Sequence, residues 1–420
     1  MNVTSLKSSS LILVIALLFP LFPTILPGTL GFQVVSVLLI FFTLLFLFSK
    51  GVFDKKSFLI SFCFLFFALL FSIQGSLLDL YNGVFVTSDI FEIPKYISIF
   101  LVFCYFRMIR MTDEDIVGLV RCYLTITVLI IIYTYFEVLL TAFKPFAYFL
   151  YKRESKEILS NKAVGPFGIT YHLAYFLLIP IFVFFSYAVI SKKLKYWFLF
   201  FLSVGSILLT QSRTMFLTMI FGFMLLPFLY HSRKRTLMFS YLTFLSVLIP
   251  IVFSIVYMYW DILTQSFSYI YSGISGLYKN GIDFSGQGKG SANIRFAQLL
   301  WAYQNQFSLP IISAGIGKGE MMLESLYALY YYRFGIWGIA LFFAFILYAN
   351  STLNFLMKND RFDILSFYFG LKLFYLLSPI ALLSSASQDS TRLMVVFYGL
   401  LAVILSRKKY LITNVKHHDN

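Results

Sequence analysis

Residues 169–190 read ITYHLAYFLLIPIFVFFSYAVI and contain no Asp, Glu, Lys or Arg. Two further apolar runs follow at 194–210 and 214–230, separated from one another and from the first run by short polar breaks. A helix of about 20 mostly apolar residues is long enough to cross a bilayer. This stretch therefore predicts three successive membrane-spanning helices that are joined by tight turns.

The composition of the whole chain agrees with this interpretation. Of its 420 residues, 60% are hydrophobic and only 12% are charged, which is about half the charged fraction of an ordinary soluble domain. So few charges exclude a cytosolic enzyme, a disulfide-stapled secreted domain and an intrinsically disordered chain. The pattern predicts an all-α polytopic membrane bundle, a single transmembrane domain over 1–420. Its expected spans, about twelve in number, are 10–27, 30–48, 57–74, 94–109, 117–140, 169–190, 194–210, 214–230, 236–259, 328–350, 364–384 and 391–406.

The distribution of basic residues predicts how these spans are oriented. With the N-terminus inside and the spans alternating, Lys and Arg greatly outnumber Asp and Glu on the inner side and only slightly on the outer side. This is the bias that the positive-inside rule describes, so both termini are expected inside. The net charge of +15 is then mostly a signal of topology, and nucleic acid is not an expected partner.

Two outer loops are long, 141–168 and 260–327, and long loops without regular structure usually carry function. The first is basic. Its cations are Lys144, Lys152, Arg153, Lys156 and Lys162. One interpretation is a solvated short helix in which these residues pair with neighbouring glutamates. The other is a basic rim that attracts anionic lipid head groups or a diphosphate.

Two candidate binding residues follow the basic loop. The segment Gly165-Pro-Phe-Gly-Ile-Thr-Tyr-His-Leu-Ala174 contains His172, the only histidine outside the inner loops and tail. His172 is either a hydrogen-bonded interfacial residue or part of a site. The segment Gln-Ser-Arg-Thr at 211–214 holds Arg213 at the membrane boundary, where an arginine is costly unless it snorkels or has a partner. Snorkelling to head groups is one explanation, and binding of a pyrophosphate by the planar guanidinium is the one we favour.

The second long loop is expected to contain short helices and a reactive carboxylate. A helix over 294–306 places Arg295 and Gln298 on one face. Further on, Gly-Ile-Gly-Lys-Gly at 315–319 lacks the GxxxxGK[ST] pattern of a nucleotide loop. Its glycines suit close approach of the backbone to a phosphate or a sugar.

The carboxylates Glu320 and Glu324 come next, on one face of a predicted helix that continues through Arg333. A carboxylate beside cations near a low-dielectric boundary suits a general base. The alternative is that these glutamates only form ion pairs with Lys318 or Arg333.

In their order, these segments resemble the bacterial O-antigen polymerase (Wzy-type) and O-antigen ligase superfamily. The segments that carry the resemblance are Gly165–Ala174, Ser-Arg-Thr at 212–214, the helix from Arg295 to Trp301, Pro310, Gly315-Ile-Gly317, Glu324-Ser-Leu-Tyr327 and Gly335-Ile-Trp-Gly338. The resemblance implies a GT-C-type glycosyltransferase of the bacterial inner membrane that acts on the periplasmic side. It also implies undecaprenyl-diphosphate-linked oligosaccharide repeat units as substrates, membrane lipids and a chain-length regulator protein as partners, and no cofactor or metal.

The resemblance also assigns roles to residues. Ligases of the superfamily typically have a histidine at the position of Glu324, which favours a polymerase here. Glu324 and Arg295 are the expected catalytic residues: Glu324 takes the proton of the acceptor hydroxyl, with His172 as second choice, and Arg295 neutralises the departing diphosphate. The expected substrate-binding residues for diphosphate and sugar are Arg213, Arg153, His172 and Lys318. A ligase, a lipid-linked oligosaccharide flippase and a solute or ion transporter remain alternatives.

Overall fold

The structure is a computed structural model of the 420-residue chain. It describes residues 111–140, 162–230, 291–305, 323–387 and 390–418, together with isolated residues elsewhere. This part of the chain is helical and contains no strand, so the predicted all-α class is confirmed for the described residues. The elements are α5 (Asp113–Leu139), η4 (Gly165–Phe167), α8 (Thr170–Ser191), α9 (Leu194–Thr210), α10 (Arg213–Tyr230), α14 (Ser291–Gln304), α15 (Leu326–Asn359), η5 (Phe362–Ile364), α16 (Leu365–Ala381) and α17 (Thr391–His418).

Helices long enough to cross a membrane identify the chain as a membrane protein. Within the described residues, four helices meet this criterion: Asp113–Leu139, Thr170–Ser191, Leu326–Asn359 and Phe362–Ala381. The helices α9 and α10 are apolar but shorter. The predicted spans from 117–140 onward, apart from 236–259, coincide with α5, α8, α9, α10, α15, α16 and α17 to within several residues, except that α15 continues to Asn359 and α17 to His418. The spans 10–27, 30–48, 57–74, 94–109 and 236–259 lie almost wholly outside the described residues.

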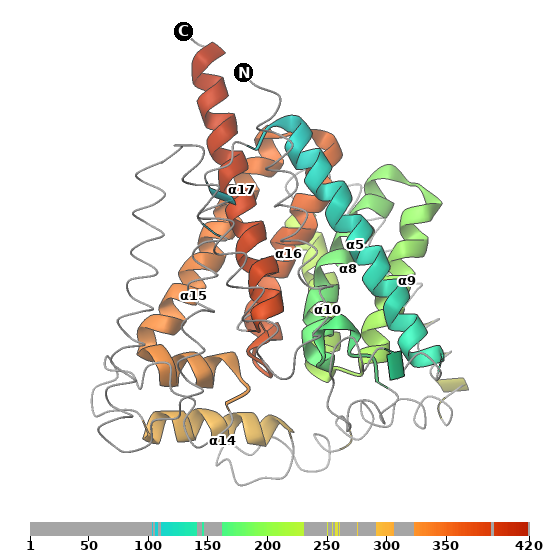
Figure 1. The fold of residues 1–420 in the computed structure, drawn as a ribbon, viewed down its shortest axis with the longest axis vertical. Coiled ribbons are helices and arrows are strands. Elements are labelled where there is room, and N and C mark those ends of the chain that lie inside the picture. The colour runs from blue at the N-terminus through green and yellow to red at the C-terminus, as the bar shows by residue number, and fades with distance from the viewer. Residues whose placement is uncertain are drawn as a thin grey trace.

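The described helices run alternately between two ends of the bundle (Figure 1). One end holds the start of α5, the α8–α9 and α15–α16 connections and the end of α17. The opposite end, hereafter the α14 end, holds α14, the starts of α8, α10, α15 and α17, and the ends of α5, α9 and α16. Helix ends that the sequence assigns to one side of the membrane are thus found at one end of the bundle.

Local signals account for where individual helices begin. The Thr112 side chain caps α5 by accepting a hydrogen bond from the backbone N–H of Asp115, and the Asp115 carboxylate accepts one from the backbone N–H of Thr112. Such a capping box satisfies two N–H groups that a helix terminus otherwise leaves without partners. Three acidic residues in the first turn, Asp113, Glu114 and Asp115, complement the positive end of the helix dipole.

The helix α15, which contains the span predicted over 328–350, is kinked. Gly335 interrupts it with φ 62° and ψ −159°, a backbone region that is essentially restricted to glycine. The part before Gly335 lies across the α14 end beside α14, and the part after it runs to the opposite end (Figure 1). Ring contact between Trp301 of α14 and Tyr332 of α15, with centroids 5.2 Å apart, fixes the first part against α14.

The helix α8 lies at the centre of the described bundle and packs against α9, α10 and α16. Its residues are apolar around its whole circumference, and 83% of its spanning window is buried, as expected for a helix enclosed by others. Close approach to α16 depends on Gly370. A Cβ atom at this position would lie 2.7 Å from the backbone nitrogen of Val183, which is too close for the two helices to keep their separation.

We therefore expect Gly370→Ala to destabilise the protein by about 1–3 kcal/mol, the usual cost of overpacking a close-packed interior. Thermal unfolding of the purified protein in detergent would measure the change as a lower Tm. The matched control is Gly118→Ala on α5, where an added Cβ meets no atom within 4 Å. An unchanged Tm in Gly370→Ala would show that α8 and α16 separate at no cost.

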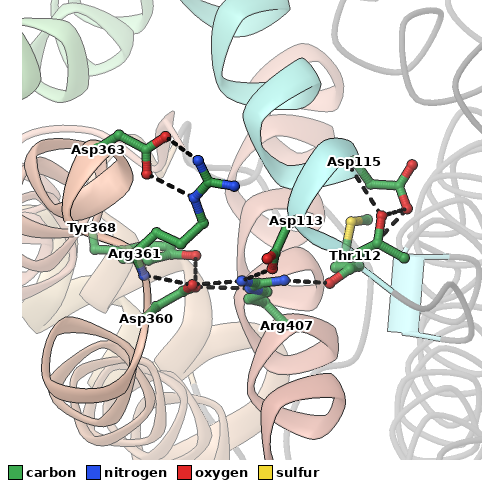
Figure 2. A network of polar contacts seen from close by, with 9 residues as sticks. Thr112, Asp113, Asp115, Asp360, Arg361, Asp363, Tyr368 and Arg407 are labelled. Atoms are coloured by element: carbon green, nitrogen blue, oxygen red, sulfur yellow. Dashed lines mark hydrogen bonds and ion pairs between the residues drawn. The ribbon is translucent and has the colours of Figure 1, made fainter. Parts of the chain in front are cut away.

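An arginine-centred cluster joins three helices at the end opposite α14 (Figure 2). Arg407 of α17 is 0% exposed. Its Nε donates to Asp360 Oδ2 at 2.8 Å, its Nη1 to the carbonyl of Met111 at 2.9 Å, and its Nη2 to both Asp113 and Asp360 at 2.5 Å. Tyr368 of α16 donates to Asp360 Oδ2 at 2.7 Å. This Arg407 cluster ties the start of α5 and the α15–α16 turn to α17.

Candidate functional site

The predicted catalytic residues Arg295 and Glu324 form an ion pair at the α14 end. Arg295 lies on α14, and Glu324 lies directly before α15. Its Oε2 atom contacts the Nη1 atom of Arg295, and the two side chains are 21% and 26% exposed. The pair is therefore accessible to an incoming molecule while much of it is shielded from water. This contact adds Arg295 to the cations near Glu324, and Lys318, the other suggested partner before α15, lies outside the described residues.

The side chain of Gln298 holds the main chain of Glu324 in place. Gln298 is 3% exposed, and its Oε1 accepts the backbone N–H groups of Glu324 at 3.1 Å and Ser325 at 3.3 Å. The predicted shared face of Arg295 and Gln298 is thus confirmed, because both contact the same segment. The main chain of Glu324 has a further partner, because the backbone N–H of Ala386 donates to its carbonyl at 2.5 Å.

These contacts correct one prediction about Glu324. The residue was expected on a helix continuing through Arg333, but the helix begins only at Leu326. The backbone N–H groups just before that helix are bound by the Gln298 side chain. The segment before α15 is therefore held by tertiary hydrogen bonds, which a helical periodicity in the sequence does not reveal.

Aromatic side chains of α14 contact those of the first part of α15. Besides the Trp301–Tyr332 contact, the rings of Tyr303 and Tyr331 are stacked with centroids 6.3 Å apart. Tyr303 is 67% exposed. Flat aromatic faces are suited to contact with sugar rings, and an amphipathic aromatic residue also suits the membrane–water boundary.

The Gly165–Ala174 segment forms a second group of candidate residues at the same end. Its first part is the 3-10 turn η4, and His172 lies in the first turn of α8. His172 is partly exposed, and its ring meets that of Tyr171 edge-on with centroids 4.8 Å apart. Its position at a helix entrance agrees with the sequence, and it has interactions with its neighbours.

The structure confirms the tight hairpin that was predicted around Arg213. The helix α9 ends at Thr210, Gln211 follows in the left-handed conformation with φ 53°, and α10 begins at Arg213. The backbone N–H of Ser212 donates to Thr210 Oγ1 at 3.2 Å, which closes the turn. Arg213 is consequently fixed at the start of a helix, where backbone N–H groups and the helix dipole favour anions.

Neighbouring residues of α16 connect the two groups. Tyr175, one turn after His172, is hydrogen-bonded to Ser378 at 3.0 Å. Tyr327, three residues after Glu324, donates to the carbonyl of Pro379 at 2.9 Å. Since Ser378 and Pro379 are adjacent, the entrance of α8 and the entrance of α15 are fixed relative to each other through the end of α16.

Three charged residues at this end were missed as candidates. Glu137 of α5 is 3% exposed, Arg333 of α15 is 3% exposed and Arg392 of α17 is 4% exposed. In the sequence they are charges near the ends of apolar runs, and Arg333 is considered there only as a partner for Glu320 or Glu324. A charge within an apolar run is a signal worth following, because burying it requires specific partners.

Two predicted binding residues, Arg153 and Lys318, lie outside the described residues, as do the glycines at 315–319 and Glu320. Among the described residues, the α14 end combines arginines suited to phosphate oxygens with a carboxylate suited to take a proton. Comparisons with protein-family models, with curated proteins and with solved structures give no match.

Proposed function

We propose that the chain is a membrane glycosyltransferase of the O-antigen polymerase type. It transfers a growing glycan from undecaprenyl diphosphate to a hydroxyl group of an incoming lipid-linked repeat unit. The observation that carries this proposal is the partly exposed Arg295–Glu324 pair, whose arginine lies on the same helix as the exposed Tyr303. Such a pair offers one group that binds a diphosphate and one that accepts a proton, which are the two groups the reaction needs.

In the proposed reaction, the bond between the anomeric carbon of the donor glycan and the diphosphate oxygen breaks. A new bond forms between that carbon and the acceptor oxygen. The acceptor proton passes to Glu324, and undecaprenyl diphosphate leaves with the electron pair of the broken bond. Arg295 and Arg213 stabilise the negative charge on this leaving group, because charge-assisted bonds from guanidinium to phosphate are strong in a partly dehydrated site.

The ion pair itself suggests how the carboxylate is made available. A diphosphate carries more negative charge than one carboxylate and matches the planar fork of a guanidinium. When it binds Arg295, it competes with Glu324 for the same N–H groups. Glu324 is then released from its partner at the moment when an acceptor hydroxyl needs a base. The backbone contacts from Gln298 keep Glu324 in place during this exchange.

The membrane setting supports the same reaction class. Four apolar helices offer surfaces for polyprenyl chains, and α14 lies across the end of the bundle (Figure 1), where head groups and lipid-linked sugars would meet it. We place the α14 end on the periplasmic side of the bacterial inner membrane, with both termini in the cytoplasm and a separate chain-length regulator as partner. Further parts of the proposal are the twelve-span GT-C architecture and a reaction that requires no metal or cofactor.

Glycan banding of a strain that lacks the gene tests this function. With a polymerase lost, the lipopolysaccharide core should carry single repeat units, and the wild-type chain should restore the long-chain ladder. Uncapped core would identify a ligase, and repeat units stranded on the cytoplasmic side would identify a flippase. A normal ladder in the deletion strain would contradict the proposal.

A further inference from the structure

Glu137 occupies a position where a carboxylate is unfavourable unless it has a specific task. It lies in the last turn of α5, near the negative end of the helix dipole. It is also 3% exposed, so its charge has been removed from water at considerable cost. An apolar residue of similar size would fill the same space equally well.

The carboxylate of Glu137 binds two successive backbone N–H groups. Its Oε2 accepts the N–H of Gly165 at 2.8 Å, and its Oε1 accepts the N–H of Val164 at 3.4 Å. Val164 has right-handed helical angles and Gly165 left-handed ones, with φ 54°. A right-handed residue followed by a left-handed one turns consecutive N–H groups toward one side and forms an anion-binding nest. Here the anion in the nest is Glu137.

The nest belongs to residues 162–168, hereafter the strap, which three helices hold. Glu137 holds it to α5. The backbone N–H of Ala163 donates to the carbonyl of Leu209 on α9 at 2.9 Å. On the α8 side, a Cβ added to Gly165 would lie 2.9 Å from Leu173 Cδ1, and the φ of 54° at this position strains any residue other than glycine.

The strap connects Glu137 to two candidate binding residues. It leads directly into α8, whose first turn contains His172. It also bonds to the last turn of α9, four residues before Arg213. The strap thus reaches His172 along the chain and Arg213 through the Ala163–Leu209 hydrogen bond, so a shift of the strap changes the entrance of α8 and the hairpin together.

We propose that Glu137 is a positioning residue, which holds the strap so that His172 and Arg213 face the lipid diphosphate. This inference rests on the proposed function, because it assumes that these two residues bind that group. Glu137 itself is enclosed and acts through the strap. The variant Glu137→Gln keeps the size of the side chain but presents an amide NH₂ to one of the two N–H groups and removes the charge.

Hydrogen exchange of the purified full-length protein tests whether Glu137 holds the strap. In Glu137→Gln, peptides covering 162–169 should exchange about tenfold faster than in the wild type, because the nest loses its anion. The exposed Glu114→Gln on the same helix is the matched control and should leave exchange unchanged. Unchanged exchange of the strap in Glu137→Gln overturns the inference.

Glycan-transfer kinetics with undecaprenyl-diphosphate-linked repeat units test whether the contact between Glu137 and the strap contributes to substrate binding. Glu137→Gln should raise KM about tenfold with a smaller change in kcat, since displaced binding groups weaken substrate positioning. The rise in KM should nearly vanish in a His172→Ala, Arg213→Ala background, where nothing is left to position. A KM increase that persists unchanged in that background contradicts a positioning role.

A second variant tests the inference even if Glu137→Gln fails to fold. Gly165→Ala disturbs the same strap from the backbone side, so it should raise KM similarly, and the double variant should be no worse than either single one. Losses that multiply in the double variant overturn the inference. A wild-type protein that transfers no glycan contradicts the proposed function alone, because the exchange measurement still reports whether Glu137 holds the strap.

Discussion

Replacing Arg295 by alanine is expected to lower the rate of glycan transfer by about a hundredfold or more, the usual effect of removing one donor that stabilises a developing anion. The loss follows from two changes at once. The leaving diphosphate loses a guanidinium, and Glu324 loses the partner that keeps it in place until substrate arrives. Arg295→Lys should recover only part of the rate, because an ammonium keeps the charge but does not reproduce the planar fork. Polymer length and rate with lipid-linked repeat units would measure the effect.

A matched control for Arg295 lies at the opposite end of the bundle. Arg361 binds Asp363 through Nε at 3.1 Å and Nη2 at 3.0 Å, with the side chains 49% and 50% exposed. Arg361→Ala thus removes an arginine–carboxylate pair of the same kind without touching the α14 end. The Arg361→Ala variant should therefore polymerise the repeat units at the wild-type rate. Long chains of normal length in Arg295→Ala, with membrane insertion confirmed, would contradict the assigned role of Arg295.

The role of Glu324 is tested separately from that of its partner. Both Glu324→Gln and Glu324→Ala should fail to polymerise, since neither side chain can take a proton from the acceptor hydroxyl. Glu324→Gln retains the size of the side chain and the backbone bonds from Gln298, so its failure would be chemical. If either variant polymerises at a near-normal rate, Glu324 is not the base, and His172 becomes the residue to examine.

The largest loss of stability is expected from the Arg407 cluster. Arg407→Ala should destabilise the protein by about 3–5 kcal/mol, because it leaves the carboxylate of Asp360 buried without its cation. Arg407→Lys should recover little, since one ammonium cannot reach Asp360, Asp113 and the carbonyl of Met111 together. Thermal unfolding in detergent would measure both changes. Arg361→Ala is again the control, since the exposed pair that it removes contributes at most about 1 kcal/mol.

The same cluster gives an expected pH dependence. Burial raises the pKa of Asp360, but hydrogen bonds from Arg407, Tyr368 and the Arg361 backbone outweigh it, so the pKa lies below its ordinary value of 3.8. A carboxyl whose pKa is lowered by folding stabilises the folded state above its unfolded pKa and loses this contribution as the pH falls through its folded pKa. The stability difference between the wild type and Asp360→Asn should therefore be constant from pH 7 to about 5 and shrink below about pH 4. A difference that stays constant down to pH 3 would contradict this account of Asp360.

Local patterns in the sequence were sufficient to predict most of the described helices. An uninterrupted apolar run such as 169–190 has few alternatives to a spanning helix. The Gln-Ser-Arg turn before α10 and the shared face of Arg295 and Gln298 also follow from neighbouring residues alone. These features depend on spacing along the chain, which a single sequence contains.

Tertiary contacts account for what the sequence did not reveal. Arg407 bonds to Met111 at a sequence separation of 296 residues, and no periodicity links the two. Glu324 was placed on a helix because its spacing allowed it, yet contacts with Gln298 and Ala386 hold it before the helix begins. Gly335 was noted as part of a motif, but the kink appears only in its backbone angles. Pairing of distant segments decides each of these cases.

The most direct test of the proposed function uses the purified protein in liposomes. Undecaprenyl-diphosphate-linked repeat units are supplied as the only source of sugar, without any nucleotide sugar. The account predicts a ladder of two, three and more units, with one undecaprenyl diphosphate released for each linkage formed, and loss of that ladder in Arg295→Ala. Repeat units that remain single with the wild-type protein, or a ladder that persists unchanged in Arg295→Ala, would contradict it.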